Sequence, residues 1–110
     1  MSLALSGCVN YSPDDEQYFI ARKNFHYQSD LVNEYRLYSY IDKPFYGDCE
    51  DFAFTLQHQM GGDVWYVLLN YTLPHAVLVK DSIVYDMNRK YLKSLYPGKF
   101  ITILKVASAY

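Results

Sequence analysis

The sequence of 110 residues lacks the features that define several large protein classes. It has no run of basic residues, and its net charge is −2, so nothing in it favours a nucleic-acid partner. No segment approaches the ~20 apolar residues of a transmembrane helix. It contains no internal repeat, low-complexity tract or linker. Apolar residues make up 51% and charged residues 20%, so we expect one globular domain.

Cysteine is also scarce, since the chain contains only Cys8 and Cys49. Two cysteines do not identify a disulfide framework, although a Cys8–Cys49 disulfide is one alternative. The residues Leu5-Ser6-Gly7-Cys8 match the pattern that bacterial lipoproteins carry at their lipidated cysteine. A complete signal peptide also has a basic segment and an apolar stretch of ~7–15 residues, and here seven residues precede Cys8.

Residues 1–12 are therefore interpreted as an N-terminal segment that is either a lipoprotein signal remnant or a chance match. Residues 13–110 are interpreted as the folded domain. On the lipoprotein interpretation the membrane is reached only through lipid on Cys8, and the protein lies in the bacterial cell envelope or periplasm. Otherwise we expect a cytoplasmic protein.

Three helices are predicted in the first half of the chain. The run SPDDE starts a helix over residues 12–23, because a cap residue is followed by proline and by acids at the positive end of the helix dipole. A second helix is predicted from Ser29 or Asp30 to about Ile41, before Pro44. The third starts after Asp48 and ends at the pair of glycines 61–62.

The third helix carries the clearest local pattern. Asp48 is a good N-cap, and Asp51 stands three residues on, roughly as in a capping box. Apolar residues follow at helical spacing and predict the face that packs on the core: Phe52, Ala53, Leu56 and Met60.

The second half of the chain is rich in β-branched and aromatic residues, which predicts strands. The expected strands are residues 64–71, 75–80, 82–87 and 99–106, with a loop or short helical turn in residues 88–96. A two-residue loop at residues 81–82 would pair Lys80 with Ile83 in a hairpin. Helices followed by strands predict an α+β domain, with the helix that bears Cys49 packed on an antiparallel sheet.

Cys49 stands at the start of a predicted helix, among three acids. A nucleophilic cysteine needs a base and a group that orients the base. The free N–H groups and the positive dipole end of the helix favour a thiolate and can hold a developing oxyanion. The negative charges of Asp48, Glu50 and Asp51 oppose the thiolate, so this interpretation requires a basic partner.

Three histidines are candidates for that partner. His58 lies nine positions after Cys49, on the opposite side of the same helix, and is expected on the surface. His26 is expected to be solvated. His75 opens an apolar strand after Pro74, where a lone histidine is usually a hydrogen-bonded core or edge residue.

The predicted hairpin changes the interpretation of His75. In the two-residue register, His75, Asp86 and Asn88 share one face, with Asp86 diagonal to His75 at ~7–8 Å between backbones. A loop of odd length would send Asp86 to the other face. An acid within a strand is costly to bury without a partner, and His75 is such a partner; otherwise Asp86 is exposed at a strand end.

The runs GDCEDFA, HAVLV and VYDMN, in this order, resemble the transglutaminase-like cysteine peptidases of bacteria. The resemblance covers about residues 46–88 and implies a papain-like core without a required cofactor. It implies that Cys49 is the nucleophile, His75 the general base and acid, and Asp86 the residue that orients His75. Asn88 is the alternative to Asp86, because papain uses an asparagine in this role.

The same resemblance extends to a metal. In periplasmic relatives the acids beside the cysteine bind calcium, and Asp48, Glu50 and Asp51 match those positions. Calcium takes six to eight oxygen ligands, so three nearby carboxylates could begin a site. The alternative is that Asp48 and Asp51 only cap the helix.

Three functions are compatible with these residues. The first is a thiol hydrolase that transfers an acyl group from a protein or peptide amide to Cys49 and then to water; a lysine amine in place of water would make it a transglutaminase. The second is a non-catalytic, transglutaminase-like binding or assembly module, lipid-anchored if Cys8 is lipidated. The third is a metal-binding module. Only the first requires Cys49, His75 and Asp86 to converge.

Overall fold

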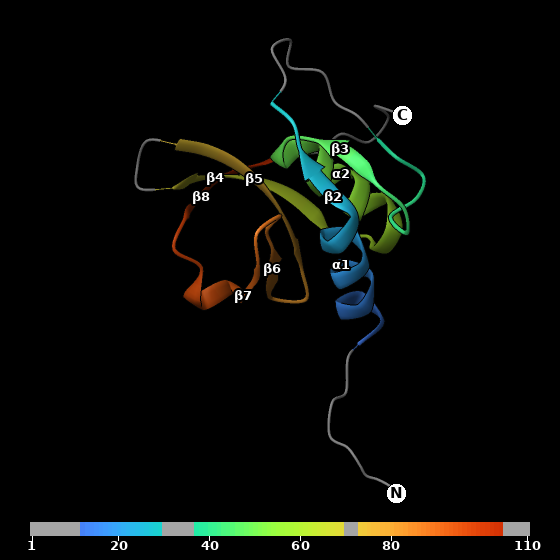
Figure 1. Cartoon of the computed structure of the whole chain (residues 1–110). Helices are drawn as coiled ribbons and strands as arrows, with labels where there is room; N and C mark the ends of the chain where they lie inside the picture. Colours follow the sequence, from blue (N-terminus) through green and yellow to red (C-terminus); the bar gives the residue numbers. More distant parts are fainter. Residues whose placement is uncertain (1–11, 30–36, 70–72, 105–110) are drawn as a thin grey trace, which may run out of the picture.

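The computed structural model describes residues 12–29, 37–69 and 73–104. These residues form an α+β fold with two α-helices, a five-stranded antiparallel sheet and a separate pair of short parallel strands (Figure 1). The predicted α+β class is therefore confirmed. Within the described ranges no helix has both the length and the apolar character that spanning a membrane requires.

The first helix, α1 (Pro13–Asn24), begins where the sequence predicts. The Ser12 side chain accepts a hydrogen bond from the Asp15 backbone N–H at 3.1 Å, which satisfies one of the free amides of the first turn. Acids lie in its first turn, while Arg22 and Lys23 lie in its last turn, so both ends complement the helix dipole.

The predicted second helix is wrong in its described part. Residues 30–36 lie outside the described residues, and residues 37–41 are not helical. Two backbone groups of this segment bind side chains of other elements: the Tyr38 N–H donates to Thr55 Oγ1 at 3.2 Å, and the Ile41 carbonyl accepts from Asn24 Nδ2 at 2.9 Å. Tertiary hydrogen bonds thus replace the local ones that a helix would make.

Two short strands flank this segment and were not predicted. The strands β2 (Phe25–Tyr27) and β3 (Phe45–Gly47) pair in parallel. The second of them leads directly into the next helix.

The helix α2 (Cys49–Met60) is capped as predicted. Asp48 accepts from two first-turn amides, and the Asp51 carboxylate accepts from the Asp48 N–H at 3.0 Å, which completes a capping box. At the other end, the Gly61 N–H donates to the Gln57 carbonyl. Residues 50–56 and 60 are buried, so α2 is covered on more sides than its apolar stripe predicts.

The sheet has the order β7-β6-β5-β4-β8. Its strands are β4 (Asp63–Leu69), β5 (Leu73–Lys80), β6 (Ile83–Tyr85), β7 (Lys90–Leu92) and β8 (Lys99–Leu104). The predicted strands are confirmed with shifted ends, apart from residues 70–71 and 105–106, which lie outside the described residues. Residues 88–96, predicted as a loop or short turn, contain β7 and a 3-10 helix, η1 (Lys93–Leu95).

The hairpin between β5 and β6 has the predicted register. Lys80 pairs with Ile83 across Asp81 and Ser82, whose φ angles of 52° and 65° are typical of a two-residue hairpin turn. The pairing ends at Leu78–Tyr85, because Asp86 starts a turn in which its N–H donates to the Arg89 carbonyl at 3.2 Å. Within the described residues, β5 therefore has β4 as its only strand neighbour from residue 73 to residue 77.

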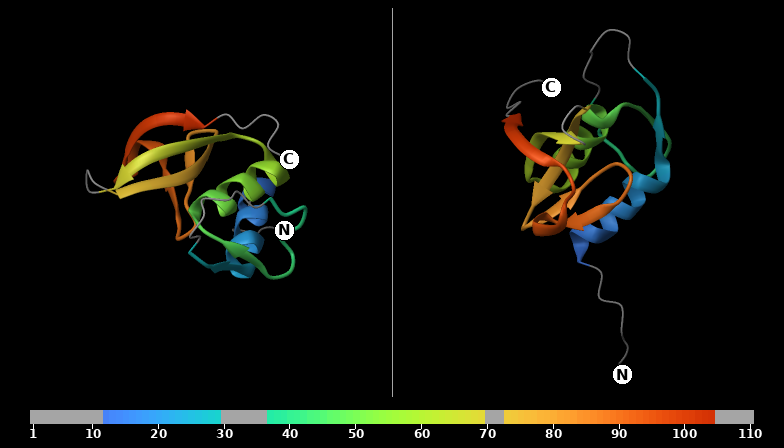
Figure 2. Two further views of the ribbon diagram at one scale, coloured as in Figure 1. Left: turned by 90° about the horizontal axis from the view of Figure 1, so that it is seen from above. Right: turned by 90° about the vertical axis from the view of Figure 1, so that its left-hand side faces the viewer.

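The core occupies both faces of this sheet. Both helices lie on one side of it (Figure 2), where Tyr18, Phe52, Leu56 and Leu78 belong to a buried apolar cluster. A second cluster on the other face contains the buried side chains of Val67, Val77, Val79, Val84 and Tyr96. The predicted packing of the helix that bears Cys49 on an antiparallel sheet is confirmed.

We predict that Gly47→Ala destabilises the domain by about 1–3 kcal/mol, as overpacking does. A Cβ atom at position 47 would lie 2.3 Å from Asp51 Oδ2, and Asp51 is fully buried and held in the capping box. Urea denaturation measures the free energy of unfolding. The control is Gln28→Ala, which changes an exposed residue directly after β2. If Gly47→Ala lowers the free energy of unfolding no more than this control does, the close approach of Gly47 and Asp51 is contradicted.

Candidate active site

The thiol of Cys49 is held at the first position of α2, directly after the cap residue. Cys49 is a free cysteine and is partly exposed. Its side chain lines a cavity of about 520 Å³. The thiol is thus both fixed by a rigid helix end and accessible to a ligand, as the sequence predicts for a reactive cysteine.

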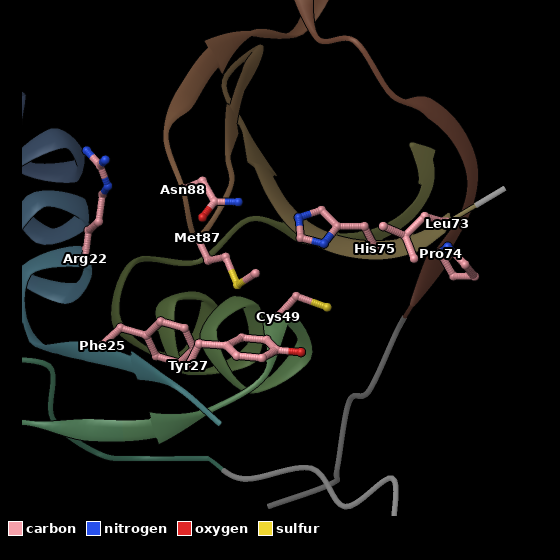
Figure 3. Close-up of a pocket in the computed structure, with 9 residues that line it drawn as sticks. All are labelled: Arg22, Phe25, Tyr27, Cys49, Leu73, Pro74, His75, Met87 and Asn88. Carbon is pink, nitrogen blue, oxygen red and sulfur yellow. The ribbon is translucent and has the colours of Figure 1, made fainter. Parts of the chain in front are cut away.

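His75 lies beside this thiol on β5, and 6% of its surface is exposed. Its Nε2 atom is 2.8 Å from Asp86 Oδ2, and Cys49 lines the same cavity as this ring and helps to raise its pKa. Because Nε2 faces Asp86, the Nδ1 atom is the nitrogen that remains for the thiol. In Figure 3 the imidazole lies over the Cys49 side chain at the cavity. The structure therefore brings together the three residues of the predicted triad.

Asp86 is 5% exposed, and both oxygens of its carboxylate have hydrogen-bond partners. Oδ1 accepts from the Asn88 N–H at 2.9 Å, and Oδ2 accepts from the Tyr96 hydroxyl at 3.1 Å as well as facing His75. The Asp86 carbonyl accepts from the Tyr18 hydroxyl at 2.6 Å. Asn88, the predicted alternative to Asp86, thus contributes its backbone to Asp86 and its side chain to the cavity wall.

Sequence reasoning missed both tyrosines that support Asp86. Tyr18 comes from α1 and Tyr96 directly follows η1, 68 and 10 positions from Asp86. The only signal was the large number of tyrosines, thirteen in 110 residues, which does not single out any of them. Burial and the charge of Asp86 raise the pKa of Tyr96 far above 10.0, so its hydroxyl stays protonated and donates.

The pair of His75 and Asp86 is charged. Burial lowers the pKa of His75, but the hydrogen bonds and negative charges of Asp86 and Cys49 outweigh it and raise this pKa to about 9. Burial raises the pKa of Asp86, but His75, the Asn88 amide and the Tyr96 hydroxyl together hold it below the ordinary 3.8. At neutral pH an imidazolium therefore faces the thiol of Cys49.

The other two histidines lie away from this pair. His58 is exposed in the last turn of α2, as predicted. His26 is exposed on β2, also as predicted, and its ring stacks on Tyr46 with 5.0 Å between centroids.

The acids beside Cys49 bind neighbouring groups of the protein. Asp48 Oδ1 accepts from the Glu50 and Asp51 amides at 3.0 and 3.2 Å, and Asp51 accepts from the Asp48 amide. The Glu50 carboxylate accepts from the Tyr66 hydroxyl. Within the described residues no group of three or more His, Cys, Asp or Glu side chains is arranged to hold a metal ion. Asp48 and Asp51 cap α2, as the sequence predicts.

The cavity beside Cys49 is lined by residues from elements far apart in the chain. Its volume lies within the ~300–1,000 Å³ of common ligand pockets. Its walls are mixed, with apolar rings and chains, one guanidinium and one amide (Figure 3). The residues that line it are Arg22, Phe25, Tyr27, Cys49, Leu73, Pro74, His75, Met87 and Asn88.

The charged pair predicts how stability depends on pH. The pKa of His75 is raised from 6.5 to about 9, so its contribution is complete below about pH 6.5 and is lost as the pH rises through 9. The pKa of Asp86 is lowered, so its contribution is lost as the pH falls below the ordinary 3.8. Urea denaturation should give the largest free energy of unfolding between about pH 4 and 6.5. In Asp86→Asn the decline between pH 6.5 and 9 should be much flatter, and an equally steep decline would exclude the pair as its source.

We predict at most weak calcium binding by the acids beside Cys49, because the protein's own donors already occupy Asp48, Glu50 and Asp51. Titration calorimetry with calcium, with and without a chelator, measures this. Binding that survives Asp51→Ala would show that the ion sits elsewhere, whereas tight binding lost in that variant would contradict the prediction.

Comparisons of this chain with models of known protein families, with curated proteins and with solved structures find no match.

Proposed function

We propose that this domain is a thiol hydrolase that cleaves a protein or peptide amide bond through Cys49, His75 and Asp86. The observation that supports the proposal is one imidazole that is hydrogen-bonded to a buried carboxylate and that lines the same cavity as a cysteine at a helix start. The resemblance of the same three residues to the transglutaminase-like cysteine peptidases points to the same chemistry.

In the first step the Cys49 thiolate attacks the carbonyl carbon of the bound amide and forms a tetrahedral adduct. The C–N bond then breaks, and the leaving amine takes the proton that the His75 imidazolium carries at its cavity-facing nitrogen. The products are a thioester on Cys49, a free amine and a neutral imidazole. Asp86 stays ionised throughout and keeps the ring oriented.

In the second step water attacks the thioester carbon. The neutral His75 removes a proton from this water, and the C–S bond breaks to release the carboxylic acid and the Cys49 thiolate. Both the imidazolium and the thiolate are thereby restored. A lysine amine in place of water would give an isopeptide bond by the same steps.

The oxyanion needs donors near the thiol. The amides of Glu50 and Asp51 already donate to Asp48, so they are not free for this role. Within the described residues no hydrogen bond engages the Cys49 N–H, which lies at the positive end of α2. This N–H is the donor that we assign to the oxyanion.

The N-terminal pattern leaves two alternatives for the place of action, the bacterial cell envelope and the cytoplasm. Cys8 lies outside the described residues, and lipid on it would hold the hydrolase at the bacterial cell envelope. The substrate would then be a protein or peptide that is accessible at that membrane.

We predict that iodoacetamide alkylates Cys49 rapidly near pH 6 in a Cys8→Ser background, where only one thiol reports. The rate should fall about 10- to 100-fold in His75→Ala, since a hydrogen bond to a charged group contributes ~1.5–3 kcal/mol. Asp86→Asn should lower the rate less, because it disturbs the orientation and charge of His75 without removing the ring. Mass spectrometry of the modified chain measures the rate.

The control is His58→Ala, which removes an exposed imidazole at the far end of α2 and should leave the rate unchanged. A second readout follows the hydrolysis of an acetyl thioester formed on Cys49 by p-nitrophenyl acetate. It should slow about 100-fold or more in His75→Ala, the typical loss of a general base. If both rates are insensitive to His75, the catalytic proposal is wrong and the non-catalytic binding module takes its place.

A further inference from the structure

One end of the cavity carries an exposed cation that has no ion-pair partner in the described part of the chain. Arg22, in the last turn of α1, lines the cavity together with Cys49 and His75. Among the described residues no carboxylate forms an ion pair with it. Two of the three first-turn acids of the same helix are bound elsewhere: Asp14 to Lys80 at 2.9 Å and Asp15 to Lys90 at 2.6 Å.

A second arginine stands three residues after Asp86 in the chain. Arg89 ends the turn that starts at Asp86, and it is exposed. The positive charges of Arg22 and Arg89 both act on the Tyr18 hydroxyl and lower its pKa, against the larger rise that burial causes. Both guanidinium groups therefore lie within electrostatic range of one point, the hydroxyl that donates to the Asp86 carbonyl.

The carboxylates near the thiol bind other groups of the protein, and none of them is among the described residues that line the cavity. Asp86 faces His75 and Tyr96, Glu50 accepts from Tyr66, and Asp51 accepts from the Asp48 amide. The chain as a whole is acidic, with a net charge of −2, yet the described residues that line the cavity include the base Arg22 and no acid. Such a local field selects ligands by charge.

Helix capping explains only part of this arrangement. A basic residue in the last turn complements the dipole of α1 in any orientation, and Lys23 satisfies that requirement as well as Arg22 does. Only Arg22 of the two lines the cavity that contains the thiol. Its guanidinium also offers a fork of donors that matches a carboxylate.

We propose that the cavity binds peptides with an acidic side chain close to the amide bond that Cys49 attacks, and that Arg22 is the residue that selects them. Arg89 contributes to the same field from the neighbouring turn. The apolar side chains of Phe25 and Met87, which line the cavity, contact the rest of the bound peptide. This inference rests on the proposed thiol chemistry and adds the substrate class to it.

The first test compares two reagents that differ in charge, iodoacetate and iodoacetamide, on Cys49 in the Cys8→Ser chain. Arg22→Gln should lower the iodoacetate rate about three- to tenfold relative to the iodoacetamide rate, because one nearby positive charge is lost. Arg22→Lys should keep most of the preference. The matched control is Lys23→Gln, which removes the same charge one residue along, outside this cavity, and should change the ratio much less.

The second test uses two peptides that differ only in aspartate against asparagine as competitors of iodoacetamide. The aspartate peptide should protect Cys49 better, and Arg22→Gln should abolish the difference. The difference should also shrink at ~1 M salt, where the screening length falls to ~3 Å. Equal protection by both peptides, or a preference that persists in Arg22→Gln, would overturn the inference.

The two proposals fail in different ways. The iodoacetamide rate of the parent chain and its loss in His75→Ala report the thiol chemistry, and neither involves a charged reagent. A normal iodoacetamide rate in Arg22→Gln with an unchanged reagent ratio would leave the hydrolase standing and exclude the acidic substrate. A rate insensitive to His75 would exclude the hydrolase.

Discussion

The buried ion pair of His75 and Asp86 is the constraint on which the rest of the site depends. Both side chains are more than 90% buried, and an isolated charge at that depth would cost several kcal/mol. Three interactions offset this cost: the ion pair itself, the hydrogen bond from the Asn88 amide and the hydrogen bond from the Tyr96 hydroxyl. The hydroxyl of Tyr18 satisfies the backbone of the same acid. Parts of α1, β5, the turn after β6 and the residue after η1 must therefore all be in place before Asp86 can be buried.

This requirement explains the irregular end of the hairpin. β6 leaves β5 after Tyr85, and the chain turns at residues 86–89 so that the Asp86 carboxylate meets the His75 ring. The turn also leaves residues 73–77 of β5 without a strand on that side, within the described residues. The same departure that buries the acid thus opens the edge where His75 meets the thiol and the cavity.

A second constraint places the thiol. Gly47 is needed because any side chain there would collide with Asp51, and Asp51 is needed because its carboxylate completes the cap of α2. The acids around Cys49 are consequently turned toward backbone amides and Tyr66. Their carboxylate oxygens accept local hydrogen bonds, and the group beside the thiol is the imidazolium of His75. The capping hydrogen bonds of Asp48 and Asp51 therefore do not involve the thiol or the N–H of Cys49, which the proposed catalysis uses.

The sequence by itself determined the features that depend on neighbours along the chain. The start of α1 and of α2, the end of α2 at its glycines and the register across Asp81 and Ser82 were all predicted, because caps and tight turns are formed by residues a few positions apart. The strand period of two predicted that His75 and Asp86 share a face, but Asp86 lies in the turn after β6, so the turn and not the strand period places its carboxylate beside His75.

Only the tertiary structure decided the features that depend on distant partners. Residues 37–41 are not helical because the side chains of Asn24 and Thr55 bind their backbone, and the strand β7 exists because β6 lies beside it. Tyr18 and Tyr96 donate hydrogen bonds to Asp86, and Arg22 lines the cavity. No local sequence pattern predicts these contacts. The physical reason is that such contacts join residues far apart in sequence, whose meeting depends on the whole fold.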